Sequence, residues 1–360
     1  MLKWIEIDRR VIKANARAIK RELKPGVKFM AVVKADGYGH GAAEAARAAL
    51  AGGADLLGVL TAEEGARLRA EGLKAPIACL APSLPEEAGD IVRNRLIPTV
   101  DGLPFAKVFA RRGSAARPLP CRVDVDLGLR RWGVAPGDLP AFTKALSGLK
   151  TVRPLAFSAH LAYAPQKNMV EAEEKLRRFA ALAEAARLSW PDLGADAANS
   201  SVFCDLPHWQ LDMVRIGNLL YGIYPSKYYL KKKGGPPVPG LERPWKFFAR
   251  IISIKKVRRG ESLGYSSEYV APRDMRVATI PAGYSDGLSM EPRGGGIRVD
   301  AGFAYWGVLR GRKAPFIGRP GIIHTLLDIS AVPGAAAGDP VALHARRTAA
   351  NARIPRIYRG

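Results

Sequence analysis

The chain is 360 residues long, 48% hydrophobic and 25% charged, which is typical of a globular protein with room for two cored domains. Its formal net charge of +23 is spread along the whole chain without a nucleic-acid-binding motif, so we expect no nucleic-acid partner. Cys79, Cys121 and Cys204 lie far apart and lack metal-ligand spacing, which argues against a disulfide framework and against a metal site.

The N-terminal segment, residues 1–8, alternates apolar and polar side chains and predicts a strand. It lacks the apolar core of a signal peptide, and no run in the chain approaches the roughly 20 apolar residues of a membrane-spanning helix. We therefore expect a cytoplasmic protein without a membrane partner.

Residues 9–230 alternate short apolar runs with amphipathic helical patterns. The apolar runs occupy residues 27–33, 56–61, 76–81, 96–100, 121–126, 154–160, 192–199 and 212–217. Helical patterns lie between them, for example at residues 41–53, 62–72 and 169–190. Eight strand–helix units in about 220 residues predict an N-terminal (β/α)8 TIM-type barrel, so the expected fold class is α/β followed by β.

The pattern changes at residues 231–360. The stretch KKKGGPPVPG at residues 231–240 combines lysines, paired glycines and prolines, which cannot form a packed element and indicate a linker. Beyond it, strand-like runs at residues 247–257, 276–284, 314–320 and 339–345 are separated by glycine and proline. We expect a C-terminal mainly-β domain over residues 231–360, with the N-terminal strand paired to it.

Several polar side chains follow the C-terminal ends of the predicted barrel strands, where the active sites of such barrels lie. They are Lys34, Arg131, His160, Asn199, Ser200 and Arg215. The loops after the seventh and eighth strands, ANSS and RIGNLLYG, offer a hydroxyl group, glycines and backbone N–H groups to a phosphate. The sequence therefore predicts a pocket with a lysine, a phosphate site and two arginines.

Lys34 stands between the first buried run and a glycine-rich loop, GYGHG at residues 37–41. A lysine after a buried strand is most often only the first solvated residue. Here the alternating glycines let the backbone approach a ligand closely, and the loop lacks the motifs of a nucleotide-binding phosphate loop. A lysine amine facing a phosphate site suits a Schiff base with pyridoxal 5'-phosphate, whose ring stabilises a carbanion at an amino-acid α-carbon.

The block AVVKADGYGHG at residues 31–41 resembles the signature of the alanine racemase family, which are fold-type III pyridoxal-phosphate enzymes, and the resemblance extends over nearly the whole chain. It implies that Lys34 carries the cofactor and that Arg215 faces the pyridine nitrogen. The other cofactor-binding residues that we expect are Tyr38, His160, Asn199, Ser200, Gly217 and Asn218. Because a guanidinium stays charged, Arg215 would discourage protonation of the ring nitrogen and weaken the electron sink.

Inverting a carbon centre calls for an acid and a base on opposite faces. Lys34 is one of them, and the resemblance implies that the other is Tyr265, in GESLGYSSEY, from the β domain of a partner subunit. We therefore expect a homodimer whose active site is shared between subunits. A tyrosine with its ordinary pKa of about 10 needs cationic or hydrogen-bonding neighbours to act as a base, and His160 and Arg215 resemble the residues that play this part.

The resemblance also implies how a small amino-acid substrate is held. Arg131, in DLGLRRWG, would bind the substrate carboxylate in bidentate fashion, and the following Gly133 sets the register. Ile322 offers a backbone N–H to the same carboxylate, and Tyr284 matches a tyrosine that lines the entrance. Many members orient the arginine with a carboxylated lysine. The matching position here is Asp124, and we expect its carboxylate to support Arg131 without the modification.

Four positions depart from the common family pattern. Ile323 lies in the block GRPGIIH, which usually carries an acidic residue, and Ala352 stands where many members have a phosphate-contacting tyrosine that narrows the substrate gate. Met290 stands where an arginine often lines the channel, and Asp196 replaces a frequent histidine. The changes predict a weaker grip on the cofactor and a wider pocket.

The leading hypothesis is racemisation of alanine, which supplies D-alanine for cell-wall peptidoglycan. The altered gate leaves open a racemase of broader specificity, acting for example on serine or lysine. A non-catalytic pyridoxal-phosphate carrier is a further alternative, although single-domain carriers lack a β domain. A fold-related decarboxylase would place an acid where Arg215 lies, and a degenerate paralogue would keep the fold and the cofactor without the chemistry.

Overall fold

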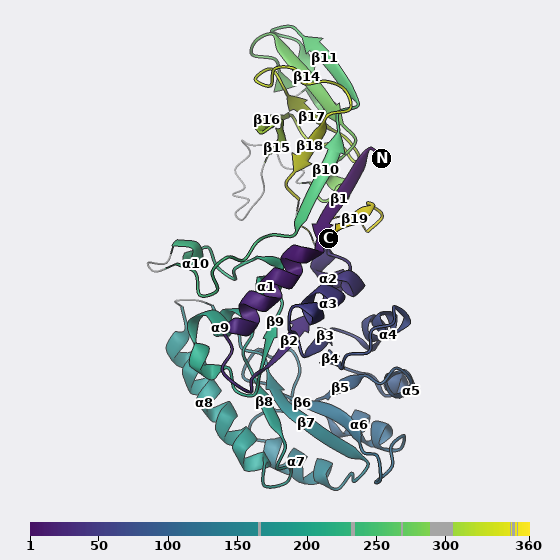
Figure 1. Ribbon diagram of the computed structural model, residues 1–360, viewed down its shortest axis with the longest axis vertical. Coiled ribbons are helices and arrows are strands. Elements are labelled where there is room, and N and C mark those ends of the chain that lie inside the picture. The colour runs from purple at the N-terminus through teal and green to yellow at the C-terminus, as the bar shows by residue number, and fades with distance from the viewer. Residues whose placement is uncertain are drawn as a thin grey trace. The chain divides into compact units, whose positions relative to one another are not determined.

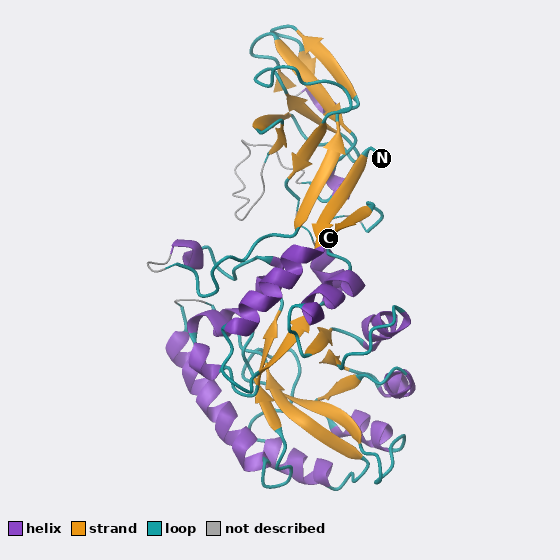
Figure 2. Cartoon of the chain, viewed as in Figure 1, coloured by secondary structure: helices purple, strands orange, loops and turns teal. Residues whose placement is uncertain are grey.

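The computed structural model describes residues 1–164, 167–231, 235–267, 269–288, 305–345, 347, 350 and 352–360. These residues form two compact units, which Figures 1 and 2 show. The barrel unit comprises Arg10–Gly37 and Gly41–Arg243, and the β unit comprises Met1–Arg9, Tyr38–His40 and Pro244–Gly360. The domain boundary expected between residues 230 and 231 stays a prediction.

The barrel unit is built around one parallel sheet. Its strands are β2 (Lys28–Val32), β3 (Leu56–Val59), β4 (Ile77–Pro82), β5 (Ile97–Val100), β6 (Leu119–Val125), β7 (Val152–Ala159), β8 (Gly194–Asp196) and β9 (Met213–Ile216), in the order β8-β7-β6-β5-β4-β3-β2-β9. The two end strands also meet, because the N–H of Arg215 donates to the carbonyl oxygen of Ala198 over 2.8 Å. The eight expected strands and the TIM-type barrel are confirmed.

Helices surround these strands in Figure 2. They are α1 (Arg9–Arg21), α3 (Ala42–Ala51), α4 (Ala62–Ala70), α5 (Ala88–Arg93), α6 (Leu103–Ala110), α7 (Leu139–Ser147) and α8 (Met169–Ala186). Shorter turns are α2 (Lys34–Gly39), α9 (Ser200–Asp205), α10 (Tyr228–Lys231), η1 (Pro85–Glu87), η2 (Pro207–Trp209) and η3 (Asn218–Tyr221). Helix α8 buries Ala172, Leu176, Phe179, Ala183 and Ala186, which are spaced three or four residues apart and share one face.

The barrel core explains why the apolar runs in the sequence are continuous. Phe29 to Val32 of β2 are all buried, because the barrel interior covers one face of the strand and the surrounding helices cover the other. A strand of an antiparallel sheet with one solvent-exposed face would instead alternate apolar and polar residues. The continuous pattern therefore distinguished the barrel strands from the later β strands.

The β unit holds a sheet with the order β11-β14-β17-β16-β15-β18-β10-β1-β19. Its strands are β1 (Lys3–Asp8), β10 (Trp245–Arg250), β11 (Ser253–Val257), β14 (Met275–Ile280), β15 (Trp306–Leu309), β16 (Arg312–Ile317), β17 (Thr325–Asp328), β18 (Pro340–Leu343) and β19 (Arg356–Arg359), with a separate pair formed by β12 (Ser262–Leu263) and β13 (Tyr269–Val270). Two short turns are η4 (Tyr265–Ser267) and η5 (Tyr284–Asp286). Strand β1 pairs antiparallel with β10 and parallel with β19. Val257, Met275, Val277 and Ile317, from β11, β14 and β16, belong to one buried hydrophobic cluster.

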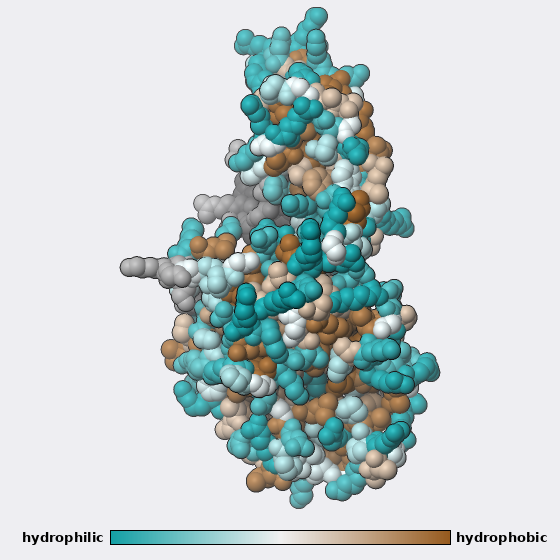
Figure 3. Space-filling model, viewed as in Figure 1, coloured by the Kyte–Doolittle hydropathy of each residue, from teal (hydrophilic) through white to brown (hydrophobic). Residues whose placement is uncertain are grey.

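On the face shown in Figure 3, hydrophilic residues are spread over both units and do not gather in one patch. This distribution fits the even spread of lysine and arginine along the sequence. Among the described residues, the helices are all too short or too polar to span a bilayer.

Candidate active site

Lys34 lies just beyond the C-terminal end of β2 and begins a turn of unusual handedness. Ala35, Asp36 and Tyr38 have φ angles of 51°, 52° and 55°, and Gly37 between them has a φ of 60°. A left-handed conformation costs a residue with a side chain about 1–2 kcal/mol, so three in one turn are a considerable strain. Such strain persists where the surrounding structure enforces it, and it concentrates at functional sites. The turn therefore marks the segment after Lys34 as a candidate site on backbone grounds alone.

Hydrogen bonds hold this turn in place. The N–H of Gly37 donates to the carbonyl oxygen of Val33 over 2.8 Å, and Asp36 accepts from the N–H of Ala42 through its side chain over 2.9 Å. A Cβ added at Gly37 would lie 3.1 Å from the Cβ of Ala45. Backbone conformation and close packing thus both favour glycine at this position, which is a more specific reason than approach to a ligand.

The amine of Lys34 lies half-buried in a cationic environment. Burial lowers the pKa of this amine, Arg131 and Arg215 lower it further, and Glu64 opposes them. A lysine whose pKa is lowered holds more of its amine in the neutral form at neutral pH, which is the form that attacks a carbonyl carbon or accepts a proton. The arrangement therefore favours a nucleophilic or basic lysine.

His160, at the C-terminal end of β7, belongs to the same environment. Burial lowers its pKa to about 3, with further contributions from Arg215, Arg131 and Lys34. The imidazole is therefore neutral throughout the physiological pH range. A neutral histidine can accept a hydrogen bond, so its nitrogen is available to a neighbouring hydroxyl group.

Arg215 is buried in the barrel, where three residues accept hydrogen bonds from its guanidinium group. Its Nη1 donates to the hydroxyl of Ser158 over 2.6 Å and pairs with the carboxylate of Asp196, and its Nη2 donates to the carbonyl oxygen of Ala159. The other oxygen of Asp196 accepts from Nη2 of Arg122 over 2.6 Å. One fully buried carboxylate thus joins two buried guanidinium groups, and Arg215 is a member of this ion-pair network.

Sequence reasoning missed two members of the network, Arg122 and Ser158. A signal for Arg122 was present, because Arg122 and Asp124 alternate in the run CRVDVD and so point to the same side of β6. Two charged residues on one side of an otherwise apolar barrel strand predict a polar network inside the barrel. Ser158 gave no comparable signal, since its role depends on strand pairing with β6.

The charge of Asp124 acts on the pKa of Arg131, whereas the hydrogen bond of Asp124 and the ring contact of Arg131 involve other residues. Asp124 accepts a hydrogen bond from Ser158 over 3.1 Å, and burial raises its pKa to about 6 against the opposing influence of Arg215. The guanidinium carbon of Arg131 lies 3.7 Å from the ring centroid of Trp132. Burial lowers the pKa of Arg131, and the charge of Asp124 raises it. The role of Asp124 in supporting Arg131 stays a prediction.

The expected phosphate-binding residues of the barrel lie on two neighbouring loops. Ser200 begins α9 after β8, and Asn218 begins η3 after Gly217 at the end of β9. The side-chain oxygen of Asn199 caps α9 by accepting from the N–H groups of Ser201 and Val202 over 2.9 and 3.1 Å. Asn199 therefore has a structural task that the sequence pattern did not reveal, since an asparagine at a helix start is a favoured cap.

Tyr38 packs with residues of the β unit. Its ring lies 5.5 Å from the guanidinium carbon of Arg347, and burial raises the pKa of its hydroxyl while Arg347 opposes this shift. The carbonyl oxygen of the adjacent Gly39 accepts from Nε of Arg356 over 3.4 Å. The tyrosine hydroxyl is therefore protonated at neutral pH and can donate to an anion.

Three expected residues of the β unit cluster on neighbouring turns. Tyr265 begins η4 with 66% of its surface exposed, and its ring centroid lies 5.6 Å from that of His324. Tyr284 begins η5 and donates its N–H to the carbonyl oxygen of Gly321 over 3.1 Å, next to the exposed Ile322. The structure thus brings the segment around Ile322 next to both tyrosine turns.

The departures from the family pattern have different surroundings. Ile323 is 61% exposed, and Ala352 is exposed with its carbonyl oxygen accepting from Arg356 over 3.0 Å. Met290 lies outside the described residues. The described part of the chain has no group of three or more histidine, cysteine, aspartate or glutamate side chains that could hold a metal ion.

The chain was compared with known proteins. Residues 7–225 match the family of alanine racemase N-terminal domains, and residues 245–357 match the family of alanine racemase C-terminal domains. The chain is 36% identical over 348 residues to the alanine racemase of Desulfovibrio desulfuricans, covering 94% of this chain and 88% of that protein. It is 33% identical to the alanine racemase of Desulfosudis oleivorans, covering 94% of this chain and 86% of that protein.

Solved structures give the same result. The biosynthetic alanine racemase of Pseudomonas aeruginosa matches with a TM-score of 0.81 and 28% identity over the whole of both chains. The alanine racemase of Streptomyces lavendulae matches with a TM-score of 0.86 and 27% identity, over the whole of this chain and 97% of that one. The barrel unit with its lysine and the β unit with its tyrosine turns thus both match the same family. The chain belongs to the alanine racemase family.

Proposed function

We propose that this protein is a pyridoxal-phosphate-dependent racemase that interconverts L- and D-alanine and supplies D-alanine for cell-wall peptidoglycan. The observation that carries the proposal is the amine of Lys34, which directly precedes a strained turn and whose pKa is lowered by burial and by Arg131 and Arg215. The names of the related proteins support the same substrate.

The residues present fit the cofactor by their chemistry. The amine of Lys34 suits an aldehyde, and the hydroxyls of Tyr38 and Ser200 with the backbone of Gly217 and Asn218 suit a phosphate. When bound, the cofactor would stabilise negative charge at the substrate α-carbon.

Arg215 would lie toward the pyridine nitrogen with its charge already balanced. Asp196 and Ser158 hold the guanidinium in one orientation through short hydrogen bonds inside the barrel. Because Asp196 also pairs with Arg122, the position of Arg215 depends on a residue that does not touch the cofactor. We expect Arg215 to act as a fixed donor that keeps the ring nitrogen unprotonated.

Lys34 would remove or return a proton on one face of the α-carbon, and Tyr265 would do so on the other face. Arg131 would hold the substrate carboxylate between them through charge-assisted hydrogen bonds. His160 is neutral at every physiological pH, so its nitrogen would accept a hydrogen bond from the tyrosine hydroxyl and orient it, while the positive charge of Arg215 would favour loss of the tyrosine proton. Two bases on opposite faces account for reaction in both directions.

We propose further that Tyr265 serves the active site of a second copy of the chain, so that the enzyme is a homodimer. A tyrosine with 66% of its surface exposed, next to the exposed Ile322 and Ile323, is unusual for a side chain that only packs. The expected result of analytical ultracentrifugation is a dimer. A monomer that retains full activity at nanomolar concentration would contradict a shared site.

The first experiment is chiral chromatography of L-alanine, L-serine and L-lysine after incubation with the purified protein and pyridoxal phosphate. We expect D-alanine to form, and we expect Lys34→Ala and Tyr265→Phe to abolish its formation. Lys74→Ala, an exposed lysine in the barrel unit, and Tyr228→Phe are the matched controls and should keep full activity. If no D-amino acid forms although the cofactor absorbs at its bound wavelength, the chain is a carrier or a degenerate paralogue.

The same experiment separates alanine from a broader substrate range. Ala352 offers only a methyl group at the expected gate, and Ile323 stands in a block that usually carries an acidic residue. If kcat/KM for serine or lysine equals or exceeds that for alanine, the broader racemase is the correct assignment. Ala352→Tyr should then shift the ratio back towards alanine.

The role of Asp124 has a test of its own. We propose that its carboxylate supports Arg131, so Asp124→Asn should raise KM for alanine more than it lowers kcat. Unchanged values of both constants would show that Arg131 is held by other contacts, such as its stacking on Trp132.

A further inference from the structure

A cavity lies at the end of the barrel opposite Lys34. Its wall includes the first residues of β2, β3, β5, β8 and β9, whereas Lys34 follows the C-terminal end of β2. Its volume is about 560 Å³, and all of the residues around it belong to the barrel unit. The N-terminal ends of barrel strands are ordinarily a place of stability and not of chemistry, so an open cavity there calls for an explanation.

The inner end of the cavity has a guanidinium group that is only partly satisfied. Arg122 has a side chain only 3% exposed, and its Nη2 is bonded to Asp196. Its Nε is buried without a hydrogen-bond partner. A buried, charged donor without an acceptor is costly, and a cavity beside it can hold the missing acceptor. Asp196 bonds Arg122 only through Nη2, and its other oxygen pairs with Arg215.

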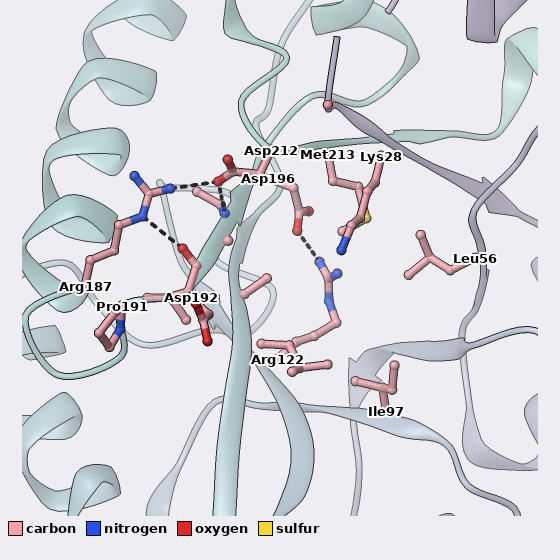
Figure 4. Close-up of a pocket in the computed structure, with 16 residues that line it drawn as sticks. Lys28, Leu56, Ile97, Arg122, Arg187, Pro191, Asp192, Asp196, Asp212 and Met213 are labelled. Atoms are coloured by element: carbon pink, nitrogen blue, oxygen red, sulfur yellow. Dashed lines mark hydrogen bonds and ion pairs between the residues drawn. The ribbon is translucent and has the colours of Figure 1, made fainter. Parts of the chain in front are cut away.

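A second cation faces the same space. Figure 4 shows the side chains of Lys28 and Arg122 projecting into the cavity. Lys28 is exposed, and it makes no ion pair within the described part of the chain. Arg187, the remaining cation that lines the cavity, already has an ion-pair partner in Asp212, over 2.9 Å. Lys28 thus has no paired anion among the described residues and Arg122 shares Asp196 with Arg215, so a bound anion would balance these two cations.

The rest of the wall is apolar. Leu56, Ile97 and Met213 line the cavity and pack into one cluster of the barrel core. A volume of this size falls in the range of small-molecule sites, roughly 300–1,000 Å³, and far exceeds that of a single inorganic ion. Apolar walls with a few convergent charges are the usual composition of a site for an organic ligand.

We propose that this cavity is a second binding site, which takes a small organic acid. The carboxylate of the ligand would accept from the guanidinium group of Arg122 and from the amine of Lys28 through charge-assisted hydrogen bonds. Its apolar body would lie against Leu56, Ile97 and Met213. Asp192 lies exposed at the rim and disfavours ligands with a second negative charge, so the ligand is a monocarboxylate.

Benzoate is the probe, and isothermal titration calorimetry on the full chain is the measurement. We expect saturable binding that benzyl alcohol, its neutral counterpart, does not reproduce. Lys28→Gln should weaken benzoate binding about fivefold to tenfold, whereas Lys74→Gln, an exposed lysine outside the lining, should leave it unchanged. Lys28 is exposed, so its replacement should leave the fold intact, which circular dichroism checks.

The proposed active site also binds carboxylates, so every titration is repeated with Arg131→Ala. The site proposed here should keep its affinity for benzoate in that variant, and Lys28→Gln should still weaken it. Arg122→Met should abolish binding if the variant folds. Absence of binding at 10-millimolar benzoate, loss of binding in Arg131→Ala, or an equal effect of the two lysine variants would overturn the proposal. Inorganic phosphate that binds as tightly as benzoate would overturn the organic-acid assignment.

Discussion

Replacing Asp196 by alanine would test the buried ion-pair network of the barrel most directly. The carboxylate of Asp196 has no solvent exposure, and its two oxygens pair with Arg122 and Arg215, whose side chains are only 3% and 6% exposed. Alanine would leave both guanidinium groups buried without this anion. The Asp196→Ala chain would also keep the apolar core intact, so the loss can be assigned to charge.

The expected magnitude follows from the cost of an uncompensated buried charge. Removing one partner of a buried ion pair destabilises a protein by about 3–5 kcal/mol, and Asp196→Ala strips two cations of a shared partner. We therefore expect the free energy of unfolding to fall by at least about 3 kcal/mol, which is a large part of the 5–15 kcal/mol typical of a domain. Replacing Arg122 by methionine in the same chain removes one stranded cation, so the double variant should recover about 1–3 kcal/mol.

The assay is urea denaturation followed by far-ultraviolet circular dichroism, because the long helices belong to the barrel unit. Asp192→Ala removes an exposed aspartate near the same strand and should change the unfolding free energy by less than about 0.5 kcal/mol. If Asp196→Ala lies within about 1 kcal/mol of the parent, or if adding Arg122→Met makes the chain still less stable, the network does not balance charge in the way described.

Three further changes have defined outcomes. Burial and three neighbouring cations lower the pKa of His160 to about 3 in the folded chain, against 6.5 in the unfolded chain. Between these two pH values only the unfolded chain binds the extra proton. The free energy of unfolding therefore decreases as the pH falls below about 6.5. His160→Gln should flatten this decline in melting temperature between pH 6.5 and 4, and an unchanged slope would contradict it. Gly37→Ala forces a side chain into a left-handed conformation 3.1 Å from Ala45 and should cost at least about 1 kcal/mol, whereas Gly137→Ala, in open space, should cost less than half of that in urea denaturation. Burial raises the pKa of Cys121 to about 12, so its thiol should resist iodoacetamide in the native protein at pH 8 and react only in denaturant, as mass spectrometry would detect.

Much of the fold could be predicted from local patterns of apolar residues in the sequence. The eight apolar runs became β2 to β9 because a strand buried on both faces must be apolar at every position, whatever its partners are. Helix α8 was likewise visible as a spacing of three and four residues. The position of Lys34 at the end of β2 followed from the same reasoning, since the lysine ends an apolar run. These features depend on residues close together in the chain, which a sequence displays directly.

The tertiary structure alone decided how the polar residues are matched. Arg122 pairs with Asp196, which lies 74 residues away in the sequence. Ser158 bonds both to Asp124 and to Arg215, and Arg215 lies 57 residues after Ser158. Each is an ordinary residue in its own stretch of sequence, and its role arises from the register of neighbouring strands. The left-handed turn after Lys34 and the cavity beside Arg122 are likewise decided by the tertiary structure and not by a local sequence pattern. The sequence by itself determined which segments are buried, because burial depends on the apolar character of each segment. Which charges share a buried carboxylate depends on distances across the barrel, and only the folded chain sets those distances.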